Sequence, residues 1–118
     1  MKYSIYIIFS SILFLFSCKK DVDYTIYYKV QIQPVDFSKT YEAKIDYTNS
    51  KGGHINENIS TSEWNSSSYG RSDGNVFIRV QGIQNVGLIN ITVTINDIKH
   101  FKTCNEINCG VEISETLN

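Results

Sequence analysis

The chain has 118 residues, with 11 lysines and arginines against 12 aspartates and glutamates, and its formal net charge at pH 7 is −1. This balance, without any basic stripe, argues against a surface that binds nucleic acid by neutralising phosphates. Without its first 17 residues the chain keeps about 100, which is enough for one domain with one hydrophobic core and too few for two.

The first 18 residues are typical of a bacterial lipoprotein export signal. Lys2 lies in a short basic start, an apolar run follows at residues 5–16, and residues 15–18 have the sequence Leu-Phe-Ser-Cys. An apolar run of about a dozen residues suits a signal peptide, whereas a helix needs ~20 residues to cross a bilayer. The final four residues resemble the lipobox, which implies cleavage before Cys18 and its lipidation. An uncleaved signal anchor is the alternative.

This interpretation divides the chain into three parts: a signal peptide at residues 1–17, a lipidated cysteine with a charged tether at residues 18–23, and a folded domain at residues 24–118. It predicts a protein of the bacterial cell envelope. The lipid on Cys18 would anchor it in the outer membrane, with the domain facing the periplasm or the cell exterior. The tether, Lys-Lys-Asp-Val-Asp, resembles the export region of surface lipoproteins from Bacteroidetes-type bacteria.

Period-two alternation of apolar and polar side chains dominates the folded part and predicts β-strands. The clearest segments are residues 24–33, 41–48, 76–81 and 89–95, and the weaker ones are residues 54–60, 98–103 and 111–117. Four strictly alternating side chains are central core candidates: Ile89, Ile91, Val93 and Ile95. In the second segment, the same alternation puts Tyr47 on the buried face and Thr48 on the solvent face.

About seven short strands, separated by turn signals, favour an all-β sandwich of antiparallel strands over a mixed fold. Pro34 follows the first strand. Residues 49–53 have the sequence Asn-Ser-Lys-Gly-Gly, which predicts a turn. Asn96 and Asp97 predict the tip of a two-residue hairpin.

Several of these segments together resemble small MmpS-like lipoproteins. They are residues 45–53, the lone Trp64 about a dozen residues later, residues 76–81, and residues 89–95 with Asp97 and Lys99. The match spans most of residues 24–117 and implies an immunoglobulin-like β-sandwich. For mycobacterial members it implies periplasmic accessories of large lipid-exporting pumps. The chain departs from the pattern at residues 61–63, where a Leu-Pro pair is common, and in a cysteine-bounded loop near its end.

Cys104 and Cys109 remain as an even pair once Cys18 is assigned to the lipid, and in an oxidising compartment we expect a disulfide between them. The four residues between them predict a hairpin loop. Facing Cα atoms at the base of a hairpin lie ~4.5–5.5 Å apart, a span that a disulfide bridges. Free thiols are one alternative. The other is a metal site with Asp97 and His100, although its spacing matches no common zinc pattern.

Residues 60–75 are rich in serine, glycine and asparagine and predict a long polar loop, a type of segment that is often functional or mobile. Trp64, Tyr69 and Arg71 are its candidate ligand-binding residues, because aromatic rings beside asparagine and aspartate can stack on sugar rings. The competing interpretation is structural, because a single tryptophan in a small sandwich more often covers the core.

The chain has no recognisable catalytic signature. Its histidines, His54 and His100, have no motif around them, and the sequence contains no Gly-x-Ser-x-Gly, phosphate-binding glycine loop or paired-histidine motif. We therefore expect a non-enzyme without a cofactor: a binding or transport-accessory module whose partner is an envelope transporter, another envelope protein or a glycan. The alternatives are a glycan-binding surface lipoprotein that uses residues 60–75 and a purely structural envelope protein.

Overall fold

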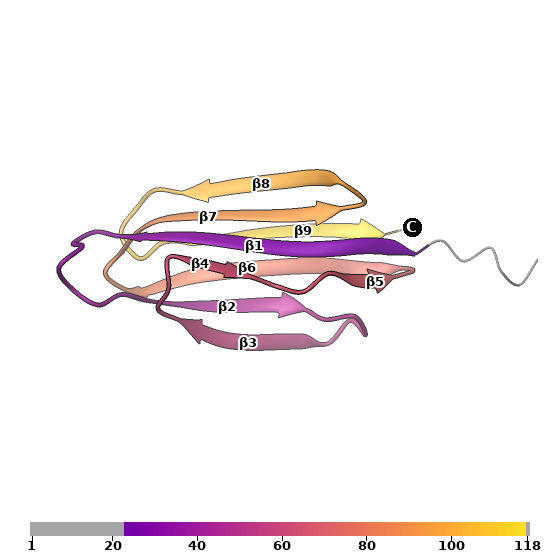
Figure 1. The fold of residues 1–118 in the computed structure, drawn as a ribbon, viewed down its shortest axis with the longest axis horizontal. Helices are drawn as coiled ribbons and strands as arrows, with labels where there is room; N and C mark the ends of the chain where they lie inside the picture. Colours follow the sequence, from indigo (N-terminus) through magenta and orange to yellow (C-terminus); the bar gives the residue numbers. More distant parts are fainter. Residues whose placement is uncertain (1–22, 118) are drawn as a thin grey trace, which may run out of the picture.

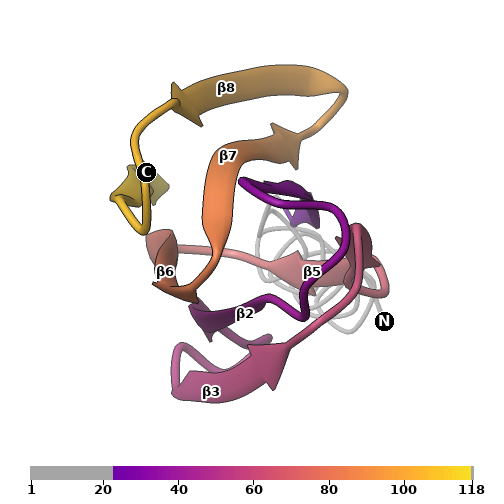
Figure 2. The same ribbon diagram turned by 90° about the vertical axis from the view of Figure 1, so that its left-hand side faces the viewer.

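The computed structural model describes residues 23–117, and these form two antiparallel β-sheets that pack face to face (Figures 1 and 2). The all-β sandwich that the alternation predicts is therefore confirmed. The predicted signal peptide at residues 1–17 and the lipidation site Cys18 lie outside the described residues. Within residues 23–117, no helix is long and apolar enough to span a bilayer.

Residues 23–117 contain nine strands. They are β1 (Tyr24–Pro34), β2 (Glu42–Thr48), β3 (His54–Ile59), β4 (Glu63–Asn65), β5 (Tyr69–Arg71), β6 (Gly74–Gln84), β7 (Val86–Ile95), β8 (Ile98–Cys104) and β9 (Gly110–Leu117). One sheet has the strand order β4-β1-β7-β8, with β5 also paired to β1, and the other has the order β3-β2-β6-β9. The middle pair of the first sheet, β1 and β7, extends from Ile26 opposite Ile95 to Pro34 opposite Val86.

Two of these strands, β4 and β5, lie in the segment predicted to be an unbroken loop, so that prediction is wrong. Trp64 is opposite Val30 of β1, and Gly70 is opposite Thr25 of the same strand. Between β4 and β5, the Ser66 N–H donates to the Tyr28 carbonyl (3.1 Å) and the Ser66 Oγ accepts from the Tyr28 N–H (3.0 Å). Pairing with β1 thus orders a segment that is too short and too polar to show alternation.

The core lies between the sheets and consists of inward-facing side chains from both. The fully buried ones are Ile26, Tyr28, Val30, Ala43, Ile45, Val76, Ile78, Val80, Val86, Ile89, Ile91 and Val93. The four core candidates at residues 89–95 are all buried, as predicted. Burying one such side chain contributes roughly 1.5–3 kcal/mol, so the interdigitated rows supply the main driving force for the fold.

The alternation fails at the end of β2, where Thr48 is buried and Tyr47 only half-buried. The β2–β6 ladder ends with Tyr47 opposite Ile78. One residue later, the Thr48 hydroxyl accepts from the Phe77 N–H (3.1 Å) in place of the next backbone bond. The side chain therefore turns into the sandwich, because its hydroxyl finds hydrogen-bond partners there.

Four connections between the sheets lie at one end of the sandwich, the left end in Figure 1, and three of them contact one another: β1–β2, β6–β7 and β8–β9. Asn85 has a φ of 55° and turns the chain from one sheet to the other. Its side-chain amide donates to carbonyls of the β1–β2 connection, including that of Asp36 (2.9 Å). Asn108, with a φ of 51°, accepts from the Val86 N–H (3.0 Å). Asparagine adopts this left-handed region more readily than most residues, so Asn85 and Asn108 fit these turns. Their side chains hold the three connections together by hydrogen bonds.

Cys104 and Cys109 form the expected disulfide, with a Cα–Cα distance of 6.3 Å. The hairpin predicted around them is wrong, because β8 pairs with β7 and β9 pairs with β6, so the connection crosses between sheets.

The predicted two-residue turn at Asn96 and Asp97 is confirmed, since both have positive φ and β7 and β8 pair on either side. In residues 23–117, no three His, Cys, Asp or Glu side chains form a group able to hold a metal ion.

We predict that reduction of the disulfide lowers the free energy of unfolding by about 2 kcal/mol, because the bond closes a short loop in the unfolded chain. Urea unfolding with and without dithiothreitol, followed by the fluorescence of Trp64, measures this loss. The Cys104→Ser/Cys109→Ser variant should match the reduced protein and show no response to dithiothreitol. Equal stability of the oxidised and reduced proteins would contradict the prediction.

Candidate functional site

A hollow of about 390 Å³, which we call the Trp64 hollow, lies where β4 and β5 of one sheet approach β2 and β3 of the other. Its lining is aromatic and polar: Tyr47, Asn49, Ser50, Glu57, Trp64, Asn65, Ser66, Ser67, Ser68 and Tyr69. Residues distant in sequence thus meet here, because sheet packing brings the β2–β3 hairpin beside β4 and β5. Figure 1 shows these strands along one side of the sandwich.

Aromatic rings from both sheets form the apolar part of the hollow. The ring centroids of Tyr47 and Trp64 lie 5.0 Å apart with an interplanar angle of 55°, and those of Tyr28 and Tyr47 lie 5.6 Å apart. Such tilted pairs contribute about 0.5–1.5 kcal/mol each beyond their buried area. Trp64 is half-buried and packs against the core, so its indole covers the core and lines the hollow at the same time.

A buried hydroxyl network lies behind these rings. The Tyr28 hydroxyl is 2.8 Å from the Thr48 Oγ1 and 2.6 Å from the Tyr69 hydroxyl, which itself donates to the Thr48 carbonyl (2.9 Å). Tyr28 is 0 % exposed, and its burial raises the pKa of the phenol far above its ordinary value. The network therefore joins β1, β2 and β5 and holds Tyr69 in position beside the hollow.

Among the residues that the structure describes, Glu57 is the only carboxylate in the lining of the hollow, and no lysine or arginine lines it. The Tyr47 hydroxyl donates to the Glu57 Oε2 (2.8 Å). Burial and this neighbouring carboxylate raise the pKa of Tyr47 from its ordinary value of 10.0 to about 12. At neutral pH the hollow thus presents neutral aromatic, hydroxyl and amide groups beside one negative charge.

The structure places two of the three predicted binding residues at the hollow and the third elsewhere. Trp64 and Tyr69 line the hollow, whereas Arg71 does not: its guanidinium donates to the Asn75 carbonyl and lies beside Gly74. Sequence reasoning missed Tyr47 and Glu57, because their place in the hollow depends on how the two sheets pack. The one available signal was Tyr47 itself, a large aromatic at an inward position of a strand.

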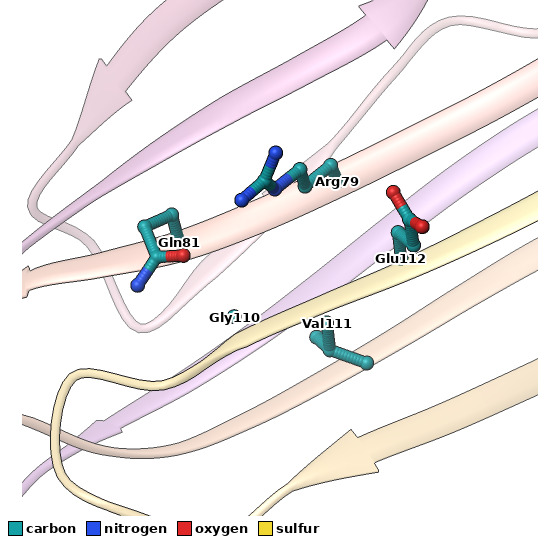
Figure 3. Close-up of a pocket in the computed structure, with 5 residues that line it drawn as sticks. All are labelled: Arg79, Gln81, Gly110, Val111 and Glu112. Atoms are coloured by element: carbon teal, nitrogen blue, oxygen red, sulfur yellow. The ribbon is translucent and has the colours of Figure 1, made fainter.

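A second hollow, of about 380 Å³, lies over β6 and β9 and is lined by Arg79, Gln81, Gly110, Val111 and Glu112 (Figure 3). Figure 3 shows the side chains of Arg79, Gln81 and Glu112 on the same face of the sheet. Arg79 is opposite Asp46 on one neighbouring strand and Glu112 on the other. Opposite charges that alternate across strands are typical of a solvated sheet face, and no aromatic ring lines this hollow. The Trp64 hollow is therefore the better candidate site.

Comparison with protein-family models finds no match to the chain. A search of curated proteins finds no significant match either.

We predict that Tyr28→Phe lowers the free energy of unfolding by about 1–3 kcal/mol, because it removes a buried hydroxyl that bonds to Thr48 and Tyr69. Tyr27→Phe is the matched control, since its hydroxyl bonds to Asn65 at the surface, and it should change the stability by less than about 0.5 kcal/mol. Urea unfolding of both variants measures the difference. Equal losses of unfolding free energy in the two variants would show that the buried hydroxyl contributes no more to stability than the surface hydroxyl does.

We also predict that stability falls as the pH rises from 10 to 12. The folded state raises the pKa of Tyr47 to about 12, so it holds the phenolic proton more tightly than the unfolded chain does. That contribution is complete below the unfolded pKa of 10.0 and is lost as the pH passes through the folded pKa. Urea unfolding across this range should show a shallower decline for Tyr47→Phe. An unchanged slope in this variant would refute the assignment.

Proposed function

We propose that the chain is a lipid-anchored, non-catalytic binding module of a bacterial cell envelope. The Trp64 hollow is the observation that carries the binding role. Its aromatic surface lies beside convergent polar groups and is backed by a buried hydrogen-bond network, so it offers a ligand both apolar contact and oriented hydrogen bonds. A module of this kind acts by holding a ligand or partner close to the membrane.

The anchor is supported by residues 1–18. The short apolar run and the Leu-Phe-Ser-Cys sequence fit lipidation of Cys18 by the enzymes that process bacterial lipoproteins. Residues 18–23 span at most about 20 Å when extended, so β1 would begin close to the membrane surface. The disulfide between Cys104 and Cys109 fits an oxidising compartment outside the cytoplasm.

The resemblance to MmpS-like lipoproteins supports a position beside an envelope transporter. In this arrangement the sandwich is the part that contacts the transporter or its cargo, and the lipid keeps it at the membrane. No step of this function requires a nucleophile, a general base or a metal, and we propose none.

The anchor is tested by intact-mass analysis and membrane fractionation of the native protein and of Cys18→Ala. We expect a mature chain that begins at Cys18 with added acyl mass, and we expect the variant to leave the membrane fraction. The variant should keep its disulfide and its unfolding curve, which separates loss of the anchor from loss of the fold. An unmodified chain that stays in the inner membrane regardless would overturn the lipoprotein assignment in favour of a signal anchor.

A further inference from the structure

The lining of the Trp64 hollow disfavours anionic ligands. Among residues 23–117, it contains one carboxylate, that of Glu57, and no cationic side chain. A phosphate, sulfate or uronic acid group would therefore meet repulsion without a compensating ion pair. The outer face of the other sheet differs, because a hollow of about 250 Å³ there is lined by Lys44 and Arg79 together with Asp46. The ligand of the Trp64 hollow is thus neutral or cationic.

The polar groups of the lining match a ligand rich in hydroxyl groups. Serine hydroxyls and asparagine amides each both donate and accept hydrogen bonds, and a sugar hydroxyl does the same. In the part of the chain that the structure describes, the hydroxyls of Ser50, Ser67 and Ser68 have no hydrogen-bond partner within the protein. They are available to a ligand from two directions, because Ser50 follows β2 and the other two lie between β4 and β5.

The aromatic part of the lining matches the face of a sugar ring. The face of an aromatic π-system is negative, so it attracts the slightly positive C–H groups on one side of a pyranose ring. Tyr47 and Trp64, whose ring centroids lie 5.0 Å apart, both line the hollow beside the serines. A quaternary ammonium would use the same rings and the charge of Glu57, but it has no hydrogen-bond donor or acceptor for the serine and asparagine groups of the lining.

We propose that the Trp64 hollow binds a neutral glycan, with a sugar ring against its aromatic wall, centred on Trp64, and the sugar hydroxyls bonded by the surrounding serines. This inference rests on the proposed binding function and specifies its ligand class. The buried network behind Tyr69 keeps the aromatic surface in place before the glycan arrives, which limits the entropy lost on binding.

The test uses the soluble mature chain with Cys18→Ala. It is titrated with neutral oligosaccharides of glucose, mannose, xylose and N-acetylglucosamine, each up to about 10 mM, a range that detects weak binding. Binding is followed by Trp64 fluorescence and by amide chemical shifts. We expect at least one oligosaccharide to bind, with shifts confined to residues 47–50 and 64–69. Trp64→Ala should weaken its affinity by about tenfold or more, as for other central aromatic contacts.

Two further variants separate loss of binding from loss of the fold. Ser67→Ala/Ser68→Ala changes exposed hydroxyls of the hollow and should weaken binding without altering the unfolding curve. Phe101→Ala is the matched control, because this exposed aromatic lies on β8, away from the hollow, and it should leave the affinity unchanged.

Three outcomes would overturn the inference. They are the absence of binding by every neutral oligosaccharide, binding that Phe101→Ala weakens as much as Trp64→Ala does, and binding of polygalacturonate or choline at the hollow in place of neutral sugars. The last outcome would leave the proposed binding function intact and change only the ligand class. An unmodified chain that stays in the inner membrane regardless of Cys18→Ala would instead overturn the lipid-anchored function without bearing on the sugar titration.

Discussion

The hydroxyl of Tyr28 is the directional contact on which the packing of the two sheets beside the hollow depends. Tyr28 lies in the middle of one sheet and Thr48 at the end of a strand in the other, so their hydrogen bond joins the sheets by a directional contact. Aliphatic packing is non-directional, so by itself it fixes the relative position of the two sheets less closely. Tyr69 completes the group, and because a buried hydroxyl without a partner is costly, each of the three requires the others. Stability and the shape of the hollow therefore depend on the same residues.

The sequence predicts the long strands of this fold well, because alternation records burial on one face over many residues. Alternation fails to predict the structure where hydrogen bonding or strand pairing, rather than an apolar side chain, determines it. Thr48 is polar and was expected at the surface, but hydrogen bonds to Phe77 and Tyr28 place it inside. The short strands β4 and β5 show no pattern because their order comes from pairing with β1. Spacing predicted the disulfide correctly, whereas the hairpin around it required knowledge of which strands β8 and β9 pair with.

The candidate site could likewise be predicted only in part from the sequence. Trp64 and Tyr69 were identifiable because large aromatics in a polar segment are unusual, and both lie at the hollow. Arg71 shared that segment, but its guanidinium donates to the Asn75 carbonyl and does not line the hollow. Tyr47 and Glu57 could not be assigned, because no local pattern shows that the β2–β3 hairpin of one sheet packs beside β4 of the other. Sequence thus locates half of the site, and sheet packing supplies the rest.

The position of β1 determines when the chain is able to fold. β1 is the first strand of residues 23–117, yet it lies inside its sheet, and its main partner β7 ends at Ile95. Pairing over such a long separation is slow, because the chain must lose loop entropy before contacts compensate for it. The sandwich therefore cannot assemble while its first half alone has been synthesised, and its first sheet stays incomplete until β7 is available. A polypeptide with this order of assembly remains able to pass through a narrow membrane pore before it folds.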